Sequence, residues 1–129
     1  MIRKHSILLF FFFTWILSNE QPQINVIDTQ QVNEEEEIII DLFATDADDD
    51  TLTFTATSSN PNNINLNINN SVLTILPGLN YTGFTFIQVI VNDNQEEDNS
   101  TNSTQFILEV LNVNDAPTLT AVDDVTFQE

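Results

Sequence analysis

The chain has 129 residues, of which 20 are acidic and only two are Lys or Arg, so its formal net charge is −18 at pH 7. Both basic residues precede Glu20, the first acidic one, which excludes nucleic acid as a partner and disfavours direct binding to an anionic membrane, because both need Lys or Arg. From residue 19 onward there is no His, Cys, Lys or Arg, which excludes catalytic triads, zinc sites and Schiff bases. We therefore expect that the protein is not an enzyme.

The first 18 residues have the layout of a secretory signal peptide. Arg3 and Lys4 form a basic start, residues 7–17 are apolar except for Thr14, and small or polar residues follow. The apolar run is too short to span a bilayer, which takes about 20 residues. We expect residues 1–18 to be a cleaved signal peptide, with an uncleaved anchor or a buried strand as the alternatives. The protein is then secreted or held at the cell surface, for example by a membrane segment downstream of this chain.

Seven segments after the signal peptide alternate apolar and polar residues with a period of two, which is typical of strands. Asn, Asp, Ser and Pro, which favour turns, fill the spacers between them. These features predict an all-β fold, a seven-stranded Greek-key β-sandwich. The apolar positions of the seven segments are Ile24 and Val26; Ile38, Ile40 and Leu42; Leu52, Phe54 and Ala56; Ile64, Leu66 and Ile68; Val72 to Leu76; Ile87, Val89 and Val91; and Phe106, Leu108 and Val110.

The end of the chain repeats its beginning at an offset of 95 residues. Residues 117–129 align without a gap on residues 22–34, with identical Pro, Asp and Glu at three positions, and the match begins just after the last predicted strand. We therefore expect residues 19–116 to form one repeat and residues 117–129 to be the truncated start of a second.

Acidic and amide residues gather in three clusters, at residues 34–37, 46–50 and 112–115, with Asp93 just after the sixth predicted strand. Calcium takes six to eight oxygen ligands from carboxylates and carbonyls, so each cluster is a candidate ligand group. Solvated turns are the alternative, because Asp and Asn are common there. An EF-hand is disfavoured: the aspartates at alternate positions from 46 to 50 fit its start, but Gly is missing after Asp50 and Thr57 replaces the late Glu.

Three motifs, TDADDDTLTFTA, VIVND and LNVNDAPTL, together resemble the cadherin repeat. The resemblance covers residues 22–117 and is strongest to the dystroglycan-type, or bacterial-style, cadherin-like domain. It implies a cadherin/Ig-like sandwich joined end to end with others in a tandem array, with Ca²⁺ bound at each junction. By the same resemblance, Asp46 and Asp48 match a loop that binds calcium at the preceding junction, and Asp93 faces that junction.

The resemblance also implies ligands at the following junction. Glu34, with Glu35, matches the family's first-strand glutamate, while Asn112, Asn114 and Asp115 match its linker motif. The linker is one residue shorter than the usual cadherin motif, and its first position is an uncharged Asn. The carboxylates that the family places before its sixth strand are also absent here, so we expect this domain to bind fewer calcium ions, or to bind them more weakly.

Four sequons begin at Asn69, Asn80, Asn99 and Asn102, and would accept glycans in a eukaryotic host. A chain this rich in Asn, Ser and Thr has about three sequons by chance, so these four decide nothing.

Together these features predict a calcium-binding repeat of a secreted or cell-surface protein, acting in cell adhesion or as a calcium-stiffened extracellular spacer. Its partners would be neighbouring repeats of the same chain and other cell-surface proteins or glycans. The alternative is a non-catalytic accessory or carbohydrate-binding module of a larger secreted enzyme.

Overall fold

The computed structural model describes residues 18–96 and 99–119. Almost all of the predicted signal peptide, and most of the predicted second repeat, lie outside the described residues. No helix within the described ranges has the length and apolar character needed to cross a membrane.

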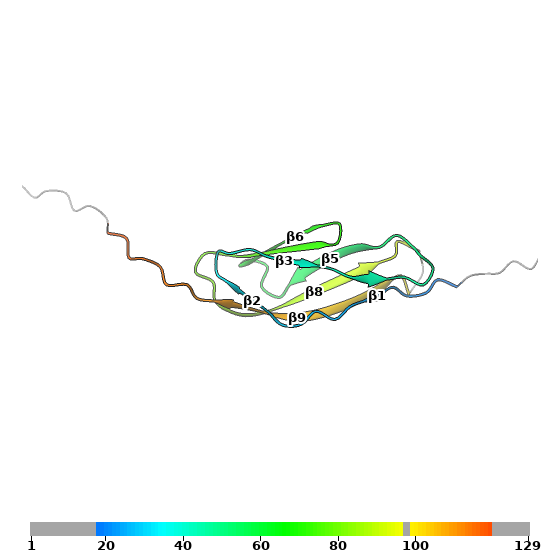
Figure 1. Cartoon of the computed structure of the whole chain (residues 1–129), viewed down its shortest axis with the longest axis horizontal. Helices are drawn as coiled ribbons and strands as arrows, with labels where there is room; N and C mark the ends of the chain where they lie inside the picture. Colours follow the sequence, from blue (N-terminus) through cyan, green and yellow to red (C-terminus); the bar gives the residue numbers. More distant parts are fainter. Residues whose placement is uncertain (1–17, 97–98, 120–129) are drawn as a thin grey trace, which may run out of the picture.

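Nine strands and no helix form the described part of the chain (Figure 1). They are β1 (Gln23–Ile24), β2 (Gln30–Asn33), β3 (Ile38–Asp41), β4 (Ala44–Thr45), β5 (Thr53–Ser58), β6 (Ile64–Asn69), β7 (Val72–Pro77), β8 (Gly83–Asn92) and β9 (Thr101–Leu111).

The strands form a sandwich of two main sheets. One sheet has the order β2-β9-β8-β5 and the other has the order β3-β7-β6, while β1 and β4 make a separate two-residue pair. All pairings are antiparallel except that of β2 with β9, which is parallel. The chain passes from β5 to β6 and β7 in the other sheet, then returns to β8 and β9, so the predicted all-β Greek-key sandwich is confirmed.

The strand count differs from the predicted seven because the second predicted strand is divided and β2 was not predicted. The first predicted strand becomes β1, which pairs with β4, whereas β2 pairs with β9 in the other sheet. Val26 lies in the crossing between them and is 83% exposed, so its predicted place on a strand face is wrong. The second divides around Leu42, which is buried and lies outside both β3 and β4, although its N–H still donates to the carbonyl of Ser71.

The core lies between the two main sheets and is built from alternate residues of their strands. Along β8, Ile87 and Val89 are fully buried while Phe86 points outward, as a period-two pattern requires. Each such aliphatic side chain contributes about 1.5–3 kcal/mol by leaving water, so this core is the main source of stability in a chain without cysteines. Its members are Val32, Leu42, Ile64, Leu73, Ile75, Ile87, Val89, Phe106, Leu108 and Val110.

The sandwich is elongated, and the chain enters at one end and leaves at the other (Figure 1). Glu34 N–H donates to Leu111 at the last residue of β9, whereas Asp93 N–H donates to Ser100 just before its first. A strand rises about 3.3 Å per residue, so the eleven residues of β9 separate the two ends by about 33 Å. Glu34 and Asp93 therefore lie at opposite ends of the domain.

Candidate metal centre

The loop between β4 and β5 curls around the carboxylate of Asp46. Its Oδ1 accepts hydrogen bonds from the backbone N–H groups of Asp48, at 2.9 Å, and Asp50, at 3.3 Å. Asp49 has a left-handed backbone, with φ of 60°, which lets the chain turn back on itself. The carboxylate oxygens of Asp46, Asp48 and Asp50 consequently lie within 4.8 Å of one another.

The second oxygen of Asp46, Oδ2, is buried and has no hydrogen-bond partner in the described structure. Burying a charged oxygen without a partner is unfavourable, and two neighbouring carboxylates add electrostatic repulsion. A hard divalent cation between the three carboxylates would remove both penalties. The donor set consists of oxygen atoms alone, which is the chemistry that calcium requires, so these residues fit a calcium ion.

The segment before β1 connects this loop to Asp93. The backbone N–H of Glu20 donates to Asp48 Oδ2 at 2.8 Å, and the side-chain amide of Asn19 donates to Asp93 Oδ2 at 2.9 Å. Asp93 is buried, and its other oxygen accepts from the N–H of Gln95. Both of its oxygens are thus paired, and it is not a member of the three-carboxylate group. The structure places Asp93 at the same end as Asp46 and Asp48, where it also holds the incoming chain through Asn19.

Asp50 belongs to the group, although the ligand set implied by the cadherin resemblance did not include it. The signal was present in the sequence, because aspartates occupy every second position from 46 to 50. Their spacing alone does not fix which oxygens converge; the two hydrogen bonds to Asp46 do.

At the opposite end, Glu34 holds the outgoing chain. Its side chain is buried, and Oε1 accepts the backbone N–H of Val113 at 2.9 Å. Glu35 is exposed in a left-handed turn, with φ of 61°.

The predicted linker residues Asn112, Asn114 and Asp115 are exposed. Each of the two amide side chains donates to the next residue's carbonyl, Asn112 to Val113 and Asn114 to Asp115. Among the residues that the structure describes, no group of three carboxylates forms at this end.

The asparagines of the four predicted sequons differ in whether their side-chain amides hold another part of the chain. Asn69 and Asn80 are exposed. The amide nitrogens of Asn99 and Asn102 instead donate to the carbonyls of Asn19 and Pro22, so a glycan on either would displace a bond that holds the incoming segment.

The two-sheet topology defines an Ig-like β-sandwich of the cadherin-like kind, a class of domain that is typically extracellular. The family model described as "Bacterial Ig domain" matches residues 19–106, and the chain belongs to this family. Such a domain is a structural module, which favours a non-catalytic role. No protein with a curated description matches the sequence.

Solved structures share the fold at low sequence identity. Domains EC1–3 of Drosophila N-cadherin match 74% of this chain with a TM-score of 0.57 and 12% identity, and an endo-fucoidan hydrolase of glycoside hydrolase family 107 matches 75% with a TM-score of 0.52 and 16% identity. The matched parts span 35% of the cadherin chain and 14% of the hydrolase chain, so each likeness concerns one domain of a larger protein.

Proposed function

We propose that this domain binds calcium at Asp46, Asp48 and Asp50, and acts as a calcium-stiffened spacer or adhesion module of an extracellular protein. The observation that carries the proposal is the buried, unpartnered Oδ2 of Asp46 beside two further carboxylates. No Lys or Arg follows residue 4, so a bound metal ion is the natural source of compensating positive charge.

Calcium would act on the loop through electrostatics. Two unit charges 4 Å apart repel by about 1 kcal/mol in water and by about 4 kcal/mol at the effective dielectric near a protein surface. The ion converts this repulsion into attraction and fixes the Asp46 loop. Because Glu20 N–H already donates to Asp48 Oδ2, fixing the loop also fixes the segment through which the chain enters the domain.

The other end supplies the second half of a spacer. Glu34 Oε1 holds the N–H of Val113, so the direction in which the chain leaves the sandwich is set by the domain itself. In a tandem array, the fixed outgoing segment of one repeat would then meet the calcium-fixed incoming segment of the next. The partners in this proposal are neighbouring repeats of the same chain, and other cell-surface proteins or glycans beyond them.

Thermal unfolding of the full chain with calcium and with EDTA tests the proposal. We expect calcium to raise the melting temperature by several degrees, because about 1 kcal/mol of added stability shifts a domain of this size by about 4–8 °C. Asp46→Asn should abolish the shift, while its amide oxygen can still accept the two loop hydrogen bonds. The matched control is Asp41→Asn, which removes one charge from an exposed position on β3 and should keep the shift. Equal melting with calcium and EDTA in the unmodified chain would contradict the proposal.

A non-catalytic accessory or carbohydrate-binding module of a secreted enzyme is the second candidate. Its support is the likeness to one domain of the fucoidan hydrolase, together with two exposed aromatic rings, Phe84 and Phe86, on the outer face of β8. Aromatic faces can stack on sugar rings, and the absence of Lys and Arg after residue 4 favours neutral over sulfated glycans. A glycan array with the unmodified chain and Phe84→Ala tests the carbohydrate-binding role: binding that is lost in the variant supports this role, and no binding contradicts it.

A further inference from the structure

The acidic residues of this chain are unevenly placed. Residues 51–92 contain no Asp, Glu, Lys or Arg, and all 20 acidic residues lie before or after this stretch. The stretch forms β5, β6, β7 and β8. Of these, β5 is the edge strand of the four-stranded sheet and β6 the edge strand of the three-stranded sheet. The side of the sandwich that carries these two edges is therefore free of charge on its strands.

β6 lacks the features that usually keep an edge strand from pairing with another chain. Such edges are protected by charged side chains, by Pro or by bulges. β6 has the sequence INLNIN and pairs with β7 over six residues without interruption, from Ile64↔Pro77 to Asn69↔Val72. It contains no charge, no Pro and no bulge, so it can accept a further strand.

The hairpin turn determines which backbone groups face the open edge. Residues 70 and 71 form a two-residue turn, and Asn70 has φ of 55°. Such a turn makes Asn69 and Val72 a hydrogen-bonded pair, and bonded pairs then alternate along the ladder. The N–H and C=O groups of Leu66 and Ile68 therefore point away from β7. The N–H of Ile64 is used by the carbonyl of Asn60.

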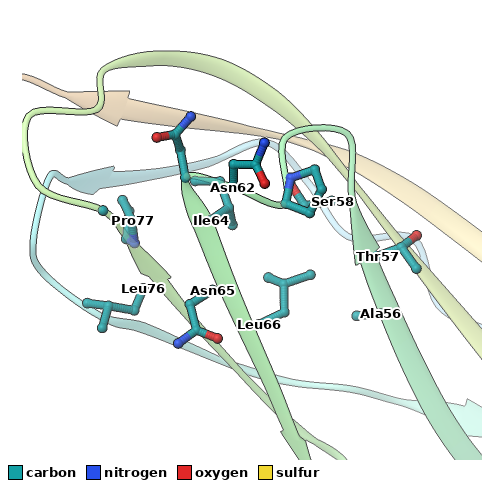
Figure 2. A pocket seen from close by; sticks show the side chains of 12 residues that line it. Ala56, Thr57, Ser58, Asn62, Ile64, Asn65, Leu66, Leu76 and Pro77 are labelled. Carbon is teal, nitrogen blue, oxygen red and sulfur yellow. The ribbon is translucent and has the colours of Figure 1, made fainter.

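A groove of about 710 Å³ lies beside this edge, between β5 and β6 (Figure 2). Ala56 of β5 and Ile64 and Leu66 of β6 line it, with Leu76 and uncharged polar residues around them. Apolar surface in a groove next to open backbone groups is suited to an added strand, which would satisfy the backbone and cover the apolar lining.

We propose that β6 pairs antiparallel with β6 of a second copy of this chain, across a two-fold axis. The backbone N–H and C=O groups of Leu66 in one copy then bond to those of Ile68 in the other. The groups of Ile68 in the first copy likewise bond to Leu66 of the second, as an isologous interface requires. Two three-stranded sheets become one six-stranded sheet, and each copy closes the groove of the other. In this register Asn67 lies directly opposite its own copy, with the two Cα atoms about 4.5 Å apart.

The distribution of charge favours a second copy of this chain as the partner that pairs with the β6 edge. Each copy carries a net charge of −18, so contacts through the strands and loops outside residues 51–92 bring carboxylates together. The β6 edge allows two copies to meet without opposing carboxylates. A cationic partner would instead be drawn to the acidic ends.

Sedimentation equilibrium of the full chain in EDTA, which removes any calcium effect, tests the proposal. We expect a monomer–dimer equilibrium that tightens as NaCl rises from about 20 to about 500 mM, because salt screens the residual repulsion between copies. Asn67→Asp, which places two carboxylates opposite each other, should weaken dimerisation at low salt by about tenfold or more.

The matched control is Gln88→Glu, which makes the same amide-to-carboxylate change at an exposed position of the internal strand β8. It should change the dimer constant by no more than about twofold, because its charge lies outside the interface. A chain that stays monomeric at all salt concentrations overturns the proposal, and so do equal effects of the two substitutions. Because calcium is absent throughout, the outcome is independent of the proposed metal centre.

Discussion

The side-chain amide of Asn19 donates a hydrogen bond of 2.9 Å to Oδ2 of Asp93, 74 residues further along the chain. Asp93 is only 1% exposed and immediately follows β8, so this bond holds the segment before β1 against the end of the four-stranded sheet. The segment continues into Glu20, whose N–H contacts the Asp46 loop through Asp48. The Asn19–Asp93 pair is thus the structural support of the candidate metal centre.

A double-mutant cycle on this pair should show strong coupling. Asn19→Ala leaves a buried carboxylate oxygen without its donor, which should lower the free energy of unfolding by about 1–3 kcal/mol. In the background of Asp93→Ala the same substitution should have a much smaller effect, because only the longer contact of Asn19 with Asn99 is then lost, giving a coupling energy of about 0.5–3 kcal/mol in urea denaturation. Gln21→Ala is the control. It removes an exposed hydrogen bond to Thr101, so it should change the free energy of unfolding much less than Asn19→Ala. Simple additivity of the two substitutions would show that the bond does not hold the segment.

The two leucines of β7 should differ sharply in their contribution to stability. Leu73 is fully buried in the core, whereas Leu76 is 40% exposed on the outer face of the same strand. Leu73→Ala should lower the free energy of unfolding by about 2–5 kcal/mol, because it removes buried contacts and leaves a cavity. Leu76→Ala should cost less than about 1 kcal/mol. If denaturant titrations gave similar losses of unfolding free energy for the two variants, the assignment of Leu73 to the core would be contradicted.

The two glycines provide a similar comparison for the backbone. Gly83, the first residue of β8, has φ of 119°, which side chains rarely tolerate, although nothing would touch an added Cβ. Gly83→Ala should therefore destabilise the domain by about 1–3 kcal/mol through backbone strain alone. Gly78→Ala should have a smaller effect, because its Cβ would meet Asn63 at 3.4 Å, an ordinary contact, without an unusual φ. Equal effects on the melting temperature would refute the assignment of strain to Gly83.

The sequence predicted those strands whose apolar residues alternate over several positions. β6 and β8 are examples, since Ile64 and Leu66, and Ile87 and Val89, face inward as their spacing requires. β2 was missed because only Val32 among its four residues is apolar, and its strand form depends on pairing with β9, about 78 residues away. Long-range pairing of this kind leaves no local pattern.

The candidate site likewise contains residues that the sequence predicted and residues that it did not. The loop from Asp46 to Asp50 was recognisable because its aspartates are close in sequence. The part played by Asn19 and Glu20 was not, because their bonds are to residues at least 28 positions away. That Asn19 and Gln95 donate to the two oxygens of Asp93 also follows only from the fold.

Calcium titration followed by the backbone amide signals of the ¹⁵N-labelled chain tests the central claim most directly. If the ion binds at Asp46, Asp48 and Asp50, the amides of Asp48, Asp50 and Glu20, which donate to these carboxylates, should shift and saturate. The expected dissociation constant is about 10⁻⁴–10⁻³ M, as for other extracellular calcium modules. The amide of Val113 at the opposite end should not move, and Asp46→Asn should abolish the shifts. Unchanged signals of these three amides at about 10 mM calcium, well above that range, would contradict the account.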